Sequence, residues 1–331
     1  MFTRRQILQA GHAAAAVTTM AGALLPSPAR AAVIDKPAKL ILGFPPGGST
    51  DVVSRLLVNH LKDYAPNFIV DNRAGAGGRI AVQAIKTSPP DGASIGLTPE
   101  SIFVIYPHVY SNLGYDPLKD FELVCSACSV TFGLVVGPMA PESIKTFQQF
   151  VDWCRANPDK ASYGSSGAGS MPHFAGEMIA KGANFKMVHV AYRGASPAVQ
   201  DLVAGQIAAN LAVLTNVLPF LESGKLRVLV TTGEKRSPFV PDAPTLSELG
   251  MKDIVAEEPF VIYMPLGTPR NIVTQLGALV QKAIGLPEVA EAYRKLALEP
   301  GRHQADEVRE LVRRDTEKWG EIVKAAGFKM E

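Results

Sequence analysis

Short apolar segments alternate with amphipathic helical patterns along most of this chain, and this alternation restricts its fold more than any other feature. The segments that read as strands are residues 39–44, 68–71, 94–97, 122–136, 162–164, 187–192, 208–214, 226–232 and 260–264. The helical patterns between them cover residues 51–64, 77–87, 143–156, 172–181, 197–204 and 216–222. Because parallel strands need helical crossovers, we predict an α/β fold with mostly parallel sheets covered on both faces.

The C-terminal part of the sequence departs from this alternation. From about residue 271 the strand patterns stop and helical patterns take over, with one apolar face on a long final helix. A helical end without strands of its own must pack on something already built, so we expect it to return to a first domain. The chain then crosses between two domains twice, along residues 122–136 and 260–264.

Residues 1–31 have the features of an export signal. Arg4 and Arg5 resemble the twin-arginine motif, an apolar run covers residues 13–25, and Ala29-Arg30-Ala31 fits a small-x-small cleavage site. The apolar run is too short to cross roughly 30 Å of hydrocarbon, so we do not expect a membrane anchor. An ordinary Sec signal with a coincidental arginine pair is the alternative, and either route leads most plausibly to a periplasm.

Charge argues against a nucleic-acid partner. The chain has 33 Lys and Arg against 31 Asp and Glu, and loss of residues 1–31 removes Arg4, Arg5 and Arg30 but no acid. The exported protein is then close to neutral, whereas nucleic-acid binders are strongly basic. We expect a monomer whose roughly 300 remaining residues form two domains.

The three cysteines do not indicate a redox or metal site. Cys125 and Cys128 are three residues apart on a predicted strand, where their side chains face opposite sides, so a bond between them needs a bend. We predict that these two cysteines and Cys154 are buried structural thiols. The six histidines show no metal-ligand spacing, and nothing in the sequence implies a cofactor or metal.

The junction at residues 40–55 predicts an anion site. An apolar strand runs into Gly47-Gly48 and then into a helix, where free N–H groups and the positive end of the helix dipole favour a carboxylate. We expect Gly47, Gly48 and Thr50 to donate, with Ser49 as a weaker candidate. Asp51 suits a helix N-cap that fixes the loop. A tight strand-to-helix turn with no ligand is the alternative reading of the two glycines.

A second junction of this kind lies about 115 residues further on, in residues 163–173. Its hydroxyls and N–H groups come from Ser165, Ser166, Gly167, Gly169 and Ser170. The neighbouring His173 is a candidate contact, although a histidine at a helix start is more often structural. Two such junctions in separate halves of one exported chain suggest a clamp around an anion.

Other candidate ligand contacts are less certain. Gly77 and Gly78 belong to a glycine-rich loop that does not match the dinucleotide pattern, because Ile80 stands where the third glycine belongs. Thr98 ends a predicted strand and suits the wall of a site. Arg193 follows another strand and suits a second carboxylate, although a surface arginine is the alternative.

Several motifs in this order resemble the extracytoplasmic receptors of tripartite tricarboxylate transporters, the Bug family. The N-terminal half contains Pro46-Gly47-Gly48-x-x-Asp51, Asp71-Asn72-Arg73-x-Gly75-Ala76-Gly77-Gly78, Pro90-Asp91-Gly92 and Tyr115-Asp116-Pro117-x-Lys119-Asp120-Phe121. The remainder contains Tyr163-Gly164-Ser165-x-Gly167-x-Gly169-Ser170-x-x-His173, His189-Val190-x-Tyr192-Arg193-Gly194, Pro241-Asp242-x-Pro244-Thr245 and Gly267-Thr268-Pro269. Each motif is weak alone, but their order and spacing together are specific.

The resemblance implies a type II periplasmic-binding-protein architecture, in which two α/β lobes joined by two crossing strands enclose a ligand cleft. Lobe 1 is expected from residues 32–130 and 256–331, and lobe 2 from residues 131–255. The implied function is capture of a small organic anion, a mono-, di- or tricarboxylate and possibly an aromatic one, for delivery to an integral-membrane permease. In that family, one glycine-rich loop from each lobe binds the ligand carboxylate.

Two other functions compete with transport. A receptor that presents its ligand to a sensor kinase would have the same sequence features. A serine hydrolase is suggested by Gly164-Ser165-Ser166-Gly167-Ala168, one residue short of the G-x-S-x-G elbow, with His189 and His303 further along the chain. No acid is marked as a partner of either histidine, so we expect no catalysis.

The chain also departs from the family pattern at three places. Ala191 stands where the family usually has proline, Ala212 where it often has an acid, and Pro259-Phe260 where it often has tryptophan. We expect these positions near the distal wall of the pocket. They bear on which carboxylate is bound more than on the fold.

Overall fold

The structure is a computed structural model that describes residues 32–330, so the predicted export signal lies outside the described residues. Its strands are β1 (Ala38–Leu42), β2 (Phe68–Asn72), β3 (Ser94–Pro99), β4 (Phe121–Val136), β5 (Ser162–Ser165), β6 (Val188–Ala191), β7 (Ala209–Val213), β8 (Arg227–Thr231), β9 (Glu257–Pro265) and β10 (Leu298–Pro300). Its helices are α2 (Ser49–Val58), α3 (Arg79–Lys86), α4 (Ser101–Val104), α5 (Tyr106–Val109), α6 (Phe147–Ala156), α7 (Met171–Gly182), α8 (Ala195–Val203), α9 (Leu214–Glu222), α10 (Arg270–Ile284), α11 (Pro287–Lys295) and α12 (Ala305–Ala326), with a 3-10 turn at Ala76–Gly78.

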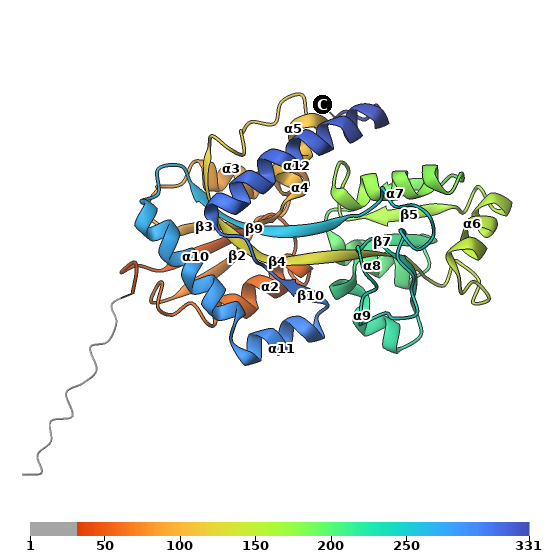
Figure 1. The fold of residues 1–331 in the computed structure, drawn as a ribbon, viewed down its shortest axis with the longest axis horizontal. Coiled ribbons are helices and arrows are strands. Elements are labelled where there is room, and N and C mark those ends of the chain that lie inside the picture. Colours follow the sequence, from red (N-terminus) through yellow and green to blue (C-terminus); the bar gives the residue numbers. More distant parts are fainter. Residues whose placement is uncertain (1–31, 331) are drawn as a thin grey trace, which may run out of the picture. The chain divides into compact units, whose positions relative to one another are not determined.

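One sheet forms the first lobe and runs in the order β2-β1-β3-β9-β4 (Figure 1). β1 pairs in parallel with both β2 and β3, because a helix connects each strand to the next. β9 pairs antiparallel with both β3 and β4. The prediction of mostly parallel sheets is therefore right for the outer strands and wrong for the crossing strands.

The second lobe is built in the same way. β5 pairs in parallel with β6 and β7, and β4 pairs antiparallel with β7 and β8. Helices α7 and α8 pack against β5 and β7. The β5–α7 and β6–α8 connections both bring a loop and a helix start to the carboxyl ends of parallel strands, where ligands bind in open α/β sheets.

β4 joins the two lobes. Its residues 121–131 pair with β9 in the first sheet, and its residues 132–136 pair with β7 and β8 in the second. Nearly all of its side chains are buried, which explains why the segment reads as one long apolar run rather than as an alternation. The two-lobed α/β arrangement predicted from the sequence is confirmed.

The C-terminal part contains one element that the sequence analysis missed. β10 pairs antiparallel with β4 at Cys128–Val130, so strands do not stop at residue 271 as predicted. Three residues are too few to show the apolar–polar alternation by which a strand is recognised in a sequence. α12 packs on β4, α4 and α5, as expected for a final helix that returns to the first lobe. Its Trp319 also lies 6.2 Å, between ring centroids, from Phe174 of α7.

The three cysteines of the chain lie in the interior. Cys125, Cys128 and Cys154 are free and buried, as predicted, and burial raises the pKa of Cys125 and Cys154 to about 12.

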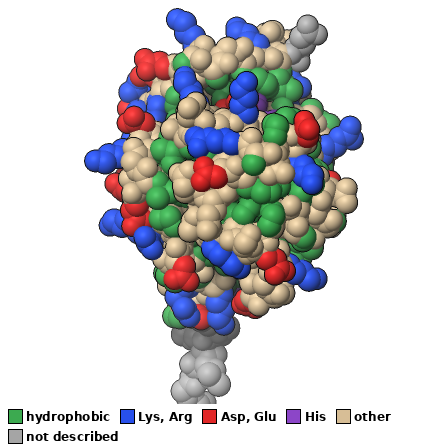
Figure 2. All heavy atoms as spheres, turned by 90° about the vertical axis from the view of Figure 1, so that its right-hand side faces the viewer, with side chains coloured by type: hydrophobic (Ala, Val, Ile, Leu, Met, Phe, Trp, Pro, Cys, Tyr) green, Lys and Arg blue, Asp and Glu red, His purple; other side chains and the backbone are tan. Residues whose placement is uncertain are grey.

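On the face shown in Figure 2, basic and acidic side chains are interspersed and form no basic patch. Within residues 32–330, no helix combines the length and apolar character needed to span a membrane.

Candidate functional site

A small cavity of about 40 Å³ lies where the two lobes meet. Four of its lining residues were predicted from the sequence: Gly48, Ser49, Thr50 and Ser166. Phe260 was expected near the distal wall of the pocket. The others were not predicted: Phe44, Pro45, Pro99, Phe132, Ala195, Val213 and Glu258. The cavity is therefore formed by the starts of two helices, α2 and α8, together with apolar side chains from the crossing strands and one acid.

The start of α2 forms one wall. Gly48 is the N-cap residue, and its φ of −80° and ψ of 168° are ordinary for any residue. Gly47 before it has a φ of +82°, which favours glycine. Among the described residues, no hydrogen bond engages the N–H groups of Gly48, Ser49 or Thr50. These donors and the positive end of the helix dipole are the elements of an anion site.

Asp51 fixes this loop from inside the helix. The prediction that it is the N-cap is wrong, because α2 begins two residues earlier and Asp51 is its third residue. Its Oδ2 accepts hydrogen bonds of 3.0 Å from the N–H of Gly47 and from Nε of Arg55. Burial alone would raise the pKa of Asp51, but these hydrogen bonds lower it below its ordinary value. The carboxylate therefore stays charged and holds the loop.

The start of α8 forms the facing wall and was not predicted as a donor. Its N-cap is Gly194, with a φ of +117°, and Ala195 lines the cavity. No hydrogen bond within the described residues engages the N–H of Ala195 or Ser196. The signal was present in the sequence, because Arg193-Gly194 follows a predicted strand and precedes a predicted helix. The sequence analysis considered only the charge of Arg193 and not the strand–glycine–helix junction around Gly194.

The loop of residues 163–173 contributes less than predicted. Only Ser166 lines the cavity. The hydroxyls of Ser165 and Ser170 donate to the carbonyl oxygen of Gly167, at 3.0 and 2.6 Å. The N–H of Gly169 donates to Nδ1 of His173 at 3.1 Å. These donors are used within the loop and its helix.

Ser165 also contacts a histidine, as a hydrolase would require. Its Oγ lies 2.7 Å from Nε2 of His189. However, Ser165 is 0% exposed, and among the described residues no acid bonds to the other ring nitrogen of His189. The ring of His189 stacks on His173 with centroids 3.9 Å apart, and desolvation followed by repulsion from His173 lowers the pKa of His189 to about 3. A buried serine beside an unsupported neutral histidine is a packing contact.

The remaining predicted residues lie outside the small cavity. Gly77 accepts a hydrogen bond of 2.9 Å at its carbonyl from the hydroxyl of Tyr106, and a Cβ on Gly78 would be 3.4 Å from the ring of Phe44. Neither glycine lines the cavity, and only Gly78 lies beside a wall residue, Phe44. Thr98 is buried one position before Pro99, which does line it. Arg193 is exposed and makes no ion pair within the described part of the chain.

Glu258 is the one acid in the cavity lining, and nothing in the sequence indicated it. It is 3% exposed, and its Oε1 accepts a hydrogen bond of 3.0 Å from the N–H of Ser101. Desolvation raises its pKa to about 7, against the lowering effect of Ser101. It directly precedes Pro259-Phe260, the pair singled out as unusual in the sequence, and Phe260 lines the cavity as expected for a distal wall.

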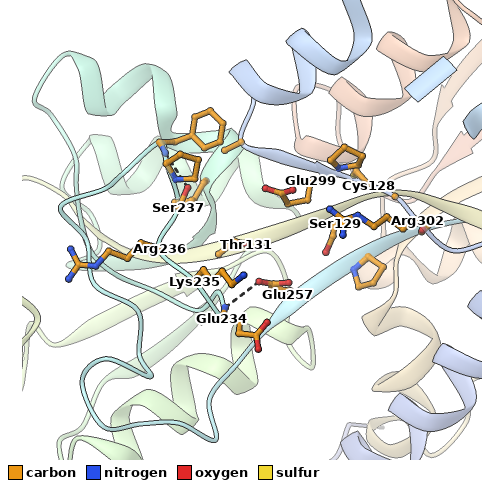
Figure 3. Close-up of a pocket in the computed structure, with 18 of the residues that line it drawn as sticks. Cys128, Ser129, Thr131, Glu234, Lys235, Arg236, Ser237, Glu257, Glu299 and Arg302 are labelled. Atoms are coloured by element: carbon orange, nitrogen blue, oxygen red, sulfur yellow. Dashed lines mark hydrogen bonds between the residues drawn. The ribbon is translucent and has the colours of Figure 1, made fainter. Parts of the chain in front are cut away.

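A larger cavity of about 410 Å³ lies elsewhere along the crossing strands (Figure 3). Cys128, Ser129 and Thr131 of β4 and Glu257 of β9 contribute to it, together with residues 234–239, 297 and 299–303. Its charged side chains are of both signs. It contains the first residue of α9, Leu214, but no residue predicted for the ligand. We therefore take the smaller cavity as the candidate site.

Comparisons with known proteins identify the family and the fold of the chain. Residues 53–328 match the family described as tripartite tricarboxylate transporter family receptor. A Cupriavidus necator protein named "UPF0065 protein in gbd 5'region" is 34% identical and covers 90% of each chain. Two solved structures also match. R. palustris Rpa4515 with adipate has a TM-score of 0.84 at 29% identity, covering 89% of this chain and 98% of that one. The periplasmic binding protein BugD has a TM-score of 0.82 at 26% identity, covering 89% and 99%. The predicted periplasmic-binding-protein fold is confirmed.

Proposed function

Because the chain belongs to the tripartite tricarboxylate transporter receptor family, we propose that it captures a small organic carboxylate between its lobes and delivers it to an integral-membrane permease. Receptors of this family bind solutes and are not enzymes, so the hydrolase hypothesis is set aside. The family's receptors are periplasmic, and we propose the same location for this protein.

One observation carries this proposal, namely that two helix starts with unpaired N–H groups face one cavity. A charge-assisted hydrogen bond contributes roughly 1.5–3 kcal/mol net, and each helix start adds roughly 0.3–2 kcal/mol for an anion. Four or five such contacts are enough for micromolar binding, about −8 kcal/mol, after ordering costs. The adipate in the Rpa4515 structure is a carboxylate and supports the same ligand class here.

The cavity is too small for such a ligand as it stands. A volume of about 40 Å³ suits one or two water molecules, so ligand entry requires the lobes to separate. We propose that lobe 1 comprises residues 32–130 and 256–331 and lobe 2 residues 131–255. The change of β4 partner between Thr131 and Phe132 supports this division. Bending at this point of β4 opens and closes the site.

A thermal-unfolding panel tests the ligand class. Purified protein is heated with mono-, di- and tricarboxylates, with an aromatic carboxylate and with neutral sugars. A carboxylate that binds folded protein raises the melting temperature in proportion to RT ln(1 + [L]/Kd). A shift with at least one carboxylate and none with sugars is expected. A panel in which only neutral sugars shift the transition contradicts the proposal.

Uptake measurements test the permease partner. Cells that lack this protein should lose uptake of the labelled ligand identified by the panel, and restoring the gene should restore uptake. Loss of a transcriptional response with unchanged uptake would instead indicate the sensor function considered from the sequence.

A further inference from the structure

The carboxyl of Glu258 is part of the cavity wall and faces no cation. Glu258 is the second residue of β9, so its side chain points to the face opposite that of its exposed neighbour Glu257. Within residues 32–330, no Lys, Arg or His forms an ion pair with Glu258. Its one hydrogen bond, from the N–H of Ser101, engages Oε1 only. Oε2 has no such bond and is not among the fully enclosed unpaired side-chain atoms.

A second buried acid interacts with Glu258. This acid is Glu100, whose pKa is affected by the charge of Glu258. It is 1% exposed, and its Oε1 has no hydrogen-bond partner among the described residues. The pKa of Glu100 lies well above its ordinary value, first because of desolvation and then through repulsion by Asp315 and Glu258. A buried carboxylate that lacks a counter-charge is costly. The missing partner at this end of the cavity is therefore a positive charge.

The charges around the cavity complement a ligand that carries both a negative and a positive group. The starts of α2 and α8 each carry roughly half a positive charge, and Glu258 contributes one negative charge when ionised. Apolar side chains, among them Phe132, Val213 and Phe260, lie around them. A molecule with a carboxylate, a short carbon chain and an ammonium group complements all three regions. A dicarboxylate would place its second charge against Glu258.

We propose that Glu258 determines ligand choice by pairing with a protonated amine, so that the receptor prefers aminocarboxylates to dicarboxylates. This inference rests on the proposed function, since it assigns the ligand carboxylate to the helix starts. Glu258 makes no contribution to the carboxylate site itself. The raised pKa of Glu258 agrees with a group whose counter-charge arrives with the ligand.

Calorimetric titration with matched ligands tests this preference. Glutarate and 4-aminobutyrate have the same number of methylene groups and differ in one terminal group, a second carboxylate in glutarate and an ammonium group in 4-aminobutyrate. Butyrate has neither of these terminal groups. 2-Aminobutyrate places the amine beside the carboxylate. At pH 7.5, at least one aminocarboxylate should bind ten-fold or more tightly than both glutarate and butyrate. If glutarate or butyrate binds as tightly as both aminocarboxylates, the inference is wrong although the proposed function stands. If no ligand in this or the broader carboxylate panel binds, the proposed function itself fails.

Two neighbouring variants assign the preference to one residue. Glu258→Gln keeps an acceptor for Ser101 and removes the charge, so it should weaken aminocarboxylate binding ten-fold or more and leave butyrate binding equal or tighter. Glu257→Gln, on the opposite face of β9, should leave all four affinities unchanged. An unchanged ratio of aminocarboxylate to dicarboxylate affinity in folded Glu258→Gln overturns the assignment. If that variant does not fold, the titrations of the unmodified protein decide alone.

Discussion

The hydroxyl of Ser196, in the first turn of α8, donates a hydrogen bond of 3.4 Å to the carbonyl oxygen of Pro46, two residues before the N-cap of α2. These residues belong to different lobes, so this contact holds the two helix starts face to face. A Cβ added to Gly47 or Gly48 would lie 3.8 or 4.0 Å from the same hydroxyl. A methyl group at either position would therefore make ordinary contact with the opposite lobe, whereas a longer side chain would meet it.

Gly48→Leu should reduce ligand affinity at least ten-fold without unfolding the protein. The φ of Gly48 suits any residue and its Cβ meets nothing closer than 3.7 Å, but a longer side chain extends into the cavity and toward Ser196. Gly48→Ala is the matched control and should retain most of the affinity. Titration with the ligand from the panel, with circular dichroism for the fold, makes the measurement. Unchanged affinity in Gly48→Leu would remove this loop from the site.

Gly194→Ala should prevent full closure. Its Cβ would lie 2.8 Å from Cδ of Pro45 in the other lobe. Gly224→Ala is the control, because Gly224 also has a positive φ, +70°, but no atom within 4 Å of its Cβ. Both variants carry backbone strain, so both should lose about 1–3 kcal/mol of stability. Only Gly194→Ala should lose affinity and show, by small-angle X-ray scattering with ligand, a larger radius of gyration. Equal affinities in the two variants would contradict this role.

Glu258→Gln should change how stability depends on pH. Because the folded pKa of about 7 lies above the ordinary value of 4.5, the folded protein binds the proton more tightly than the unfolded chain. Stability from this group is therefore lost as pH rises from 4.5 through 7. Glu100 and Tyr106, whose pKa values are raised in part by the charge of Glu258, remain in the variant. The stability gain of Glu258→Gln over wild type should grow by up to about 3 kcal/mol from pH 4.5 to about pH 8 in urea unfolding. A constant difference would show that Glu258 is ionised throughout.

Ser165 and Ser166 should have separable roles. Ser165→Ala leaves His189 without its 2.7 Å partner in a buried position, so it should cost about 1–3 kcal/mol of stability. Ser166→Ala should lower ligand affinity with little effect on stability, because Ser166 lines the cavity. Urea unfolding and titration on both variants separate the two effects. Loss of affinity in Ser165→Ala alone would show that the buried hydroxyl, and not Ser166, contacts the ligand.

The export route is tested on the segment outside the described residues. Replacing Arg4 and Arg5 by lysine should block export if the signal is of the twin-arginine type, as judged by the precursor remaining in the cytoplasmic fraction. Normal export of that variant would indicate the Sec route.

The ligand contacts at the start of α2 were easier to predict from the sequence than those in the loop of residues 163–173, for a physical reason. Gly47-Gly48 follows an apolar strand, and no side chain in the ligand wall competes for its N–H groups except Asp51, which takes only that of Gly47. In the second loop, Ser165, Ser170 and His173 form local hydrogen bonds that consume the donors counted from the sequence. Such competition depends on side-chain geometry and has no periodic signature.

Glu258 shows a second limit. An acid beside a proline at a strand start reads as a surface residue, and only the pairing of β9 with both β3 and β4 places it inside the molecule. Strands such as β4 and β9 were predictable because they form continuous apolar runs, whereas β10 has only three residues.

The most direct test of the central claim is a crystal structure of the protein with the carboxylate that binds most tightly in the panel. The account predicts that the carboxylate oxygens lie within hydrogen-bond distance of N–H groups at the starts of both α2 and α8, at Gly48–Thr50 and Ala195–Ser196. A ligand carboxylate bound away from both helix starts, for example in the larger cavity beside Cys128 and Glu257, would contradict it.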